Sequence, residues 1–190
     1  MTRILRTDIY DIKKYSDHLK SLPDHDKISR FGMKMSDFSI DQLMLSLTYN
    51  PDDHELFKAV LPSDEIIGWG HMARDSNAWE LAVSVESSHQ RKGVGNALIQ
   101  EMLEWAKFHH IEKVFMHCIE DNRVIQHLAH KHKLVTKERS AGERTAAIEL
   151  PDPSWIDINS QLWKEYSKIF DEFAELRRKA TKLMLGNTNT

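Results

Sequence analysis

The stretch HQRKGVGNAL, residues 89–98, places glycines one residue apart, after an apolar run and before a helix-like pattern. A turn between a strand and a helix leaves backbone N–H groups unpaired at the positive end of the helix dipole. Glycine also lets a ligand approach the main chain closely. The stretch therefore predicts either a phosphate-binding turn or a tight strand-to-helix connection without a ligand.

The common nucleotide-binding motifs do not fit this turn. A dinucleotide fingerprint needs a further glycine at the position of Leu98, and a P-loop needs a GK[ST] ending that the turn lacks. Both motifs are excluded. The choice between the two interpretations therefore depends on the elements that surround the turn.

The chain before the turn shows helical periodicity first and extended patterns afterwards. Asp8 is a candidate cap of the first helix, and the polar segment 23–39 is expected to be irregular. Three strand-like runs with short turns between them then indicate an antiparallel meander. The predicted helices are 8–22 and 39–50, and the predicted strands are 4–7, 54–62, 65–74 and 78–86.

The chain after the turn alternates between helix and strand and closes in a hairpin. The predicted helices are 95–110 and 121–132, and the predicted strands are 112–120, 134–139 and 144–150. This order predicts one α/β (α+β) domain over residues 1–150. The sequence PDP at 151–153 separates a C-terminal extension, 151–190, whose apolar spacing from Ser154 to about Leu185 predicts one long amphipathic helix.

Turn and element order together resemble the GNAT superfamily, the Gcn5-related N-acetyltransferases. The family signature [QR]xxGx[GA] is matched by QRKGVG, residues 90–95. The resemblance implies the GNAT fold, with a mixed, mostly antiparallel sheet splayed at its fourth and fifth strands. It also implies acetyl-CoA as cosubstrate, with the pyrophosphate on the amides of residues 91–96. The implied cofactor-binding residues are Val83, Ser84, Val85, Gln90, Arg91, Lys92, Gly93, Val94, Gly95, Asn96 and Asn122.

A second family feature is only partly present. Family members often carry an asparagine at the start of the helix after the fifth strand, and a tyrosine seven residues later that protonates the leaving thiolate. Asn122 fits the first position, but Ala129 stands where the tyrosine is expected. His127 and His130 are nearby, and we interpret them as solvated helix residues. The usual general acid is therefore missing.

Unlike the general acid, the general base has a candidate in the sequence, Glu80. Direct acetyl transfer needs a neutral amine, so a base or a water relay must first remove a proton. Glu80 lies among apolar residues in a predicted strand, and the resemblance places a glutamate base there in several family members. Two alternatives stay open: Glu80 faces solvent on an alternating strand, or Glu86 nearer the turn is the base.

Composition limits the classes of partner. The chain has 190 residues, 41% hydrophobic and 29% charged, with a formal net charge of -3. Such a balance gives no general attraction to nucleic acid or to an anionic membrane. The absence of an apolar signal segment and of a run of about 18 apolar residues predicts a cytoplasmic protein. Although histidines are frequent, none has a partner at a recognised ligand spacing, and we expect no metal.

We therefore predict an acetyl-CoA-dependent N-acetyltransferase that acts directly on a primary amine, either a small molecule or a protein lysine. RFG, residues 30–32, resembles a segment of GNAT proteins that include bacterial protein lysine acetyltransferases. One alternative is a non-catalytic, acetyl-CoA-binding regulator, favoured by Ala129. Another is an interaction protein built on the long C-terminal helix. That helix also predicts a homodimer, because its apolar stripe needs a partner.

Overall fold

The structure is a computed structural model that describes residues 2–7, 11–119, 123–140 and 143–153, together with Ser160 and Arg177. The chain divides into a unit over Met1–Pro151 and a second unit over Asp152–Thr190. The predicted cap Asp8 and, apart from Ser160 and Arg177, the predicted C-terminal helix lie outside the described residues.

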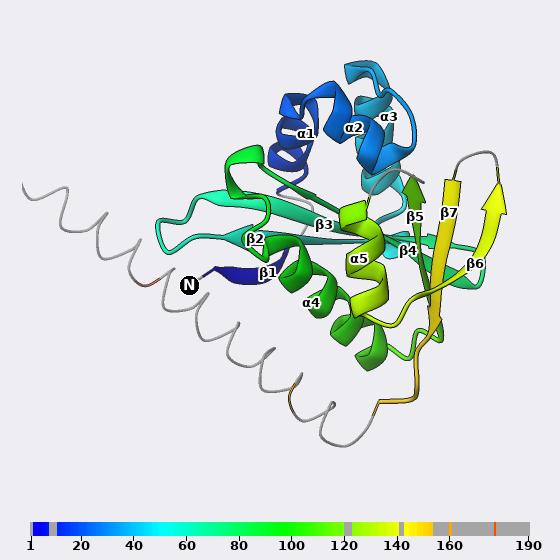
Figure 1. The fold of residues 1–190 in the computed structure, drawn as a ribbon. Coiled ribbons are helices and arrows are strands. Elements are labelled where there is room, and N and C mark those ends of the chain that lie inside the picture. Colours follow the sequence, from blue (N-terminus) through cyan, green and yellow to red (C-terminus); the bar gives the residue numbers. More distant parts are fainter. Residues whose placement is uncertain are drawn as a thin grey trace, which may run out of the picture. The chain divides into compact units, whose positions relative to one another are not determined.

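Within the described residues, seven strands form one sheet in the order β1-β2-β3-β4-β5-β7-β6 (Figure 1). Neighbouring strands are antiparallel except β4 and β5, which are parallel. The predicted meander and the predicted hairpin are both confirmed. The strands are β1 (Arg3–Thr7), β2 (His54–Val60), β3 (Ile66–Asp75), β4 (Ala78–Val85), β5 (Lys113–Ile119), β6 (Val135–Ser140) and β7 (Glu143–Glu149).

The sheet opens between β4 and β5, as predicted. These strands pair only where Trp79 lies opposite Val114 and Glu80 opposite Phe115. The remainder of β4, residues 81–85, pairs with β3 on one side but not with β5 on the other. Backbone N–H and C=O groups along that edge are therefore left for another partner.

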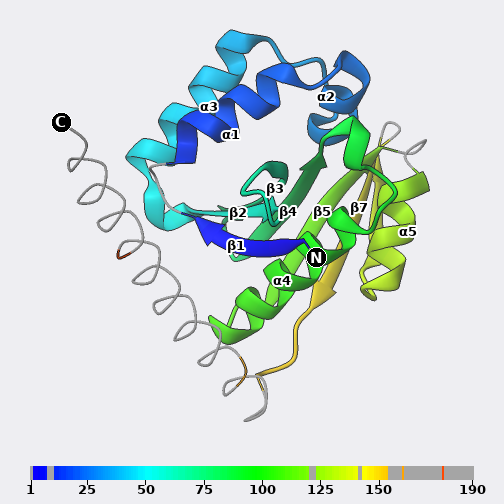
Figure 2. The same ribbon diagram turned by 90° about the vertical axis from the view of Figure 1, so that its left-hand side faces the viewer.

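One face of the sheet is covered by α4 (Val94–Phe108) and α5 (Arg123–Lys131) (Figures 1 and 2). Leu98 and Met102 are fully buried there in a core that includes Phe57 of β2. A Cβ atom at Gly70 would lie 2.5 Å from Sδ of Met102, so this glycine permits the close approach of α4 to β3. Close packing fixes the start of α4 relative to the end of β4.

The opposite face is covered by α1 (Ile12–Ser21), α2 (Asp24–Phe31) and α3 (Asp37–Tyr49) (Figure 2). Their core is built around Tyr15, Leu19, Ile40 and Trp69, each at most 1% exposed. Short 3-10 helices, η2 (Pro51–Asp53) and η3 (Ser87–His89), precede β2 and the signature turn. The two faces thus carry separate cores, with the splayed edge between them.

The prediction that residues 23–39 are irregular is wrong, because Asp24–Phe31 form α2. The helix is mostly polar on its surface, so apolar periodicity gave no signal. Its ends nevertheless follow ordinary rules: Pro23 precedes an acidic first turn, and Gly32 adopts φ 73° with its N–H donated to the Ile28 carbonyl. This helix matters because it borders the candidate site.

Candidate active site

The signature turn connects β4 to α4 through residues in the left-handed region. Gly93 has φ 85° and Arg91 has φ 58°, and α4 starts directly afterwards at Val94. No side chain caps this end of α4. The first N–H groups of the helix are therefore available for an anion, together with the positive end of the helix dipole.

A cavity of about 440 Å³, the turn cavity, lies beside this helix start. Its walls come from the end of β4, the turn, the start of α4, the α1–α2 segment and α5. It is lined by Leu22, His25, Asp26, Ser29, Arg30, Val83, Ser84, Val85, His89, Gln90, Arg91, Gly93, Gly95, Asn96, Val124, Ile125 and Leu128.

Most of the predicted cofactor residues meet in the turn cavity. Of the eleven, Lys92 is exposed and Val94 is 5% exposed in the core, and neither lines the cavity. Asn122 lies outside the described residues. The cofactor-binding role of all these residues stays a prediction.

Gln90 links the turn to both walls of the cavity. Its Nε2 donates to the carbonyl of Val85 at 3.1 Å and to Oδ2 of Asp26 at 3.2 Å. The end of β4, the turn and α2 are thereby held together by one amide. The glutamine at the first signature position thus bridges a carboxylate and a backbone carbonyl with the two N–H groups of its amide.

A buried hydrogen bond supports the same stretch of β4 from the α1 side. Nε2 of His18 lies 2.9 Å from Oγ of Ser84, and both residues are less than 10% exposed. Burial lowers the pKa of His18 from 6.5 to about 4. His18 is therefore neutral at physiological pH and fixes the hydroxyl of a residue that lines the turn cavity.

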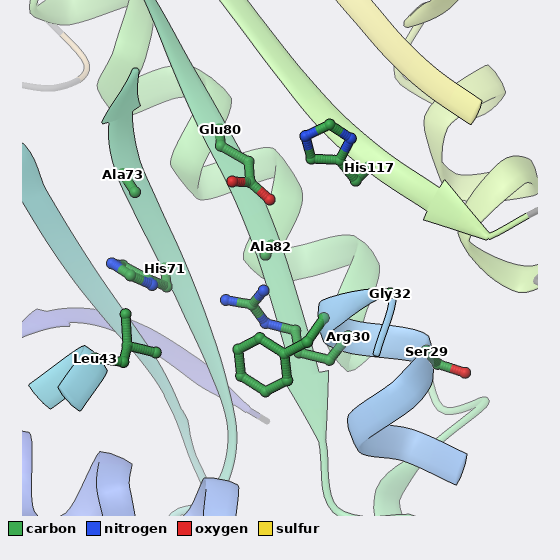
Figure 3. A pocket seen from close by; sticks show the side chains of 10 residues that line it. Ser29, Arg30, Gly32, Leu43, His71, Ala73, Glu80, Ala82 and His117 are labelled. Carbon is green, nitrogen blue, oxygen red and sulfur yellow. The ribbon is translucent and has the colours of Figure 1, made fainter. Parts of the chain in front are cut away.

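A second cavity, of about 380 Å³, lies further along the same face of β4 and contains Glu80 (Figure 3). We call it the Glu80 cavity. Glu80 is half-buried, and its carboxylate points into this space, as Figure 3 shows. Its lining consists of Ser29, Arg30, Phe31, Gly32, Leu43, His71, Ala73, Glu80, Ala82 and His117.

The two cavities meet at α2. Ser29 and Arg30 line both of them. On β4, Glu80 and Ala82 line the Glu80 cavity, and Ser84 lines the turn cavity. Because side chains two residues apart lie on one face of a strand, this face of β4 runs from one cavity to the other.

His71 is a site residue that the sequence pattern did not indicate; it is 5% exposed and lines the Glu80 cavity. Its Nε2 lies 3.1 Å from Nδ1 of His54. Burial, with smaller contributions from Arg30 and His54, lowers the pKa of His71 well below 6.5, so the ring is neutral. The register of the β3–β4 hairpin could have indicated His71, because it pairs with Ala82 and therefore lies close to Glu80, two residues along β4.

The alternative catalytic residues lie elsewhere. Glu86 is half-buried but lines neither cavity, and its carboxylate is 3.9 Å from Nδ1 of His89. Ala129 is 4% exposed and belongs to the core under α4 and α5. His127 and His130 are exposed and line neither cavity. Among the described residues, none of these supplies a proton donor to either space.

The described residues contain no further site of two common kinds. No group of three or more His, Cys, Asp or Glu side chains there could hold a metal ion. No helix in that part of the chain is long and apolar enough to cross a membrane.

Comparison with protein families places this site in context. Residues 19–133 match the acetyltransferase (GNAT) family. The chain belongs to this family. It is a GNAT-type N-acetyltransferase, and the matched region contains α2, Glu80, the signature turn and both cavities. No curated protein matches the chain in sequence.

Solved structures share the GNAT fold at low identity. A GNAT-family acetyltransferase from Streptococcus pneumoniae is 15% identical, with a TM-score of 0.63 over 80% of this chain and 100% of that chain. The GNAT domain of S. lividans PAT is 16% identical, with a TM-score of 0.66 over 78% and 90%. Spermidine N-acetyltransferase from Vibrio cholerae, solved with CoA and spermine, is 13% identical, with a TM-score of 0.62 over 78% and 95%.

Proposed function

We propose that this GNAT transfers the acetyl group of acetyl-CoA directly to a primary amine, with Glu80 as general base. The observation that carries the proposal is the meeting of two cavities along one face of β4, one beside an uncapped helix start and one containing a carboxylate. The CoA-bound Vibrio cholerae relative supports the choice of cosubstrate.

Acetyl-CoA would occupy the turn cavity. Its pyrophosphate would accept hydrogen bonds from the backbone N–H groups at the start of α4, where Gly93 and Gly95 leave room for the phosphate oxygens. The pantetheine arm would pair with the open edge of β4, near Val83 and Val85. A fixed amide on that edge, such as that of Val83, would polarise the thioester carbonyl.

The chemical step needs one proton removed before attack. Glu80 would accept a proton from the ammonium group, and the freed nitrogen lone pair would attack the thioester carbon. The C–S bond then breaks as the C–N bond is completed, and CoA leaves as the thiolate. The nitrogen loses its second proton, and the sulfur is protonated from water, since Ala129 supplies no acid. The products are the N-acetyl amine, CoA and a proton.

Binding of acetyl-CoA is tested by thermal unfolding. We expect acetyl-CoA to raise the melting temperature, because a ligand that binds only the folded state stabilises it by mass action. Gly95→Asp should abolish the shift, because it places a negative charge where the pyrophosphate would lie. NADH serves as the control ligand. A shift with NADH and none with millimolar acetyl-CoA would contradict the proposal.

Turnover separates an enzyme from the second candidate, a non-catalytic acetyl-CoA-binding regulator, which the buried Ala129 favours. Release of free thiol from acetyl-CoA, measured over a panel of amines, should require both an amine and the protein. Mass spectrometry should show an amine heavier by one acetyl group. Binding of acetyl-CoA without amine-dependent thiol release would support the regulator.

A further inference from the structure

Arg30 presents a half-buried guanidinium that lacks a carboxylate partner among the described residues. It donates to the Tyr15 hydroxyl at 3.4 Å and lies 4.8 Å over the centre of the Phe31 ring. These contacts fix the side chain but leave most of its donors unused, because a guanidinium carries five N–H groups. Figure 3 shows the guanidinium directed into the Glu80 cavity.

The same cavity holds one opposite charge. Glu80 has no salt-bridge partner among the described residues, and it does not pair with Arg30. Both charges nevertheless affect Tyr15. Burial raises the pKa of the Tyr15 hydroxyl, the Arg30 charge lowers it, and the Glu80 charge raises it further. An unpaired cation and an unpaired anion therefore face one space of about 380 Å³.

We propose that the acceptor is an amine with a carboxylate one or two carbons away, that is, an α-amino acid or a close analogue. The ammonium group would lie on Glu80 and the carboxylate on Arg30. A guanidinium binds a carboxylate through two parallel hydrogen bonds, which would fix the orientation of the amine. This inference rests on the proposed function and names its substrate class.

The cavity is poorly suited to the other acceptors considered. A polyamine carries several ammonium groups, whereas Glu80 is the only carboxylate among the residues that line this cavity. The remaining polar lining includes Arg30, which would repel a second cation. A lysine side chain within a peptide has no carboxylate near its amine, so Arg30 would stay unpaired.

Matched substrates test the proposal. Phenylalanine and phenethylamine differ only in the carboxylate, and spermidine and a lysine-containing peptide complete the panel. We expect kcat/KM for the amino acid to exceed that of the matched amine by about 10- to 100-fold, the range for a hydrogen bond to a charged group. The measurement is thiol release, with product identity checked by mass spectrometry.

A variant shows whether Arg30 is the cause. Arg30→Met should lower kcat/KM for phenylalanine by a larger factor than kcat/KM for phenethylamine, so that the preference for the amino acid is lost, and Arg30→Lys should restore part of that preference. Arg74→Met is the control, because Arg74 is an exposed arginine of β3 outside both cavities. The melting temperature and the acetyl-CoA affinity of each variant are measured alongside.

Three results would overturn the proposal. Equal losses for both amines together with weaker acetyl-CoA binding would assign Arg30 to the turn cavity, which it also lines. A preference for spermidine or the peptide would assign another substrate class while leaving the acetyltransferase proposal intact. Thiol release with none of the amines would reject the proposed function itself.

Discussion

Glu80 can be tested by a substitution that keeps its size and removes its charge. Glu80→Gln should lower kcat by about 100-fold or more, the usual effect of a positioned base. The acetyl-CoA affinity should stay unchanged, because Glu80 lines the Glu80 cavity and not the turn cavity. Steady-state kinetics with the best amine and a titration with acetyl-CoA measure the two quantities.

Glu86→Gln is the matched control for this prediction. Glu86 follows β4 and is half-buried like Glu80, but it lines neither cavity. Its replacement should leave kcat close to that of the unsubstituted protein. If instead Glu80→Gln keeps near-normal turnover from about pH 6 to pH 9, the proton is removed by another group or by solvent.

His18 gives the fold a dependence on pH. Its pKa is lowered by burial from 6.5 to about 4, so the unfolded chain binds a proton at a higher pH than the folded one. Stability is therefore fully present above about pH 6.5 and is lost as the pH falls towards about 4, by about 3 kcal/mol from this residue. Asp11 contributes little to the pH dependence above about pH 4.5, because its carboxyl titrates with a pKa near 3.8 in the unfolded chain and at a lower pH in the folded one.

His18→Gln separates this contribution from those of the other buried histidines. The amide nitrogen of glutamine can occupy the place of Nε2 and keep the hydrogen bond to Ser84. Between about pH 7 and pH 4.5, the unfolding free energy of the variant should fall less than that of the original chain. Denaturant unfolding at several pH values measures this; parallel curves for both proteins would refute the assignment.

A single site residue was predictable where a polar side chain interrupts an apolar strand pattern in the sequence. Glu80 stands out as a carboxylate within an apolar strand, and the structure places it in a cavity. Arg30 shows no such interruption, because it lies in a polar segment; His71 is a polar residue in an apolar strand, but nothing in the sequence connects it with Glu80. Only strand pairing and the packing of α2 bring them beside Glu80, so their role could not be read from periodicity.

At the scale of the element, the signature turn makes different demands on its two glycines. Gly93 adopts φ 85°, so Gly93→Ala should destabilise the fold by about 1 kcal/mol, even though its Cβ would meet nothing within 4 Å. Gly95 lies inside α4, and its Cβ would make ordinary contacts of 3.7 Å or more. Gly95→Ala should therefore stabilise the helix by up to about 1 kcal/mol.

Thermal unfolding with and without acetyl-CoA distinguishes the two effects. Gly95→Ala should raise the melting temperature of the free protein and keep the further rise produced by acetyl-CoA, because the signature accepts alanine at this position and the added Cβ makes only ordinary contacts. Gly93→Ala should lower the melting temperature. Equal changes in both variants would mean that the left-handed conformation of Gly93 contributes nothing to stability.

Strands and helices were predicted well where burial gives their apolar residues a regular spacing, and poorly where it does not. The strands and α4 are buried, and their apolar spacing located them. In α2, by contrast, Lys27 is the only residue counted as buried, and that helix was missed. Its proline, acidic first turn and terminal glycine were the available signals, and they mark helix ends without showing that a helix joins them.

At the scale of the whole molecule, element order predicted the topology, whereas the opening of the sheet came from the family resemblance. Periodicity describes each strand separately and does not say how many residues of β4 pair with β5. The sheet opens because β4 and β5 pair only at Trp79 with Val114 and at Glu80 with Phe115, and the pairing stops there. The site therefore depends on a feature of strand pairing that local patterns do not encode.

Oligomeric state is the remaining prediction at this scale, and it depends on residues outside those described. The apolar spacing from Trp155 through Ile169 and Phe173 to Leu183 predicts a helix of about 30 residues, roughly 45 Å long. A small domain does not cover that length, so part of the stripe needs another partner. A second copy of the same helix is the simplest closed solution.

Light scattering on the full chain and on a version that ends at Pro153 tests this dimer. We expect the full chain to be a dimer at micromolar concentration and the shortened chain to be a monomer. A full-length monomer would mean that the stripe is covered within one chain. A dimer that persists after shortening would place the interface in the first unit, where Phe38, Leu45 and Tyr49 of α3 are exposed apolar side chains. Their spacing puts them on one face of α3, so Phe38→Ser with Tyr49→Ser would then be the substitutions that separate the subunits.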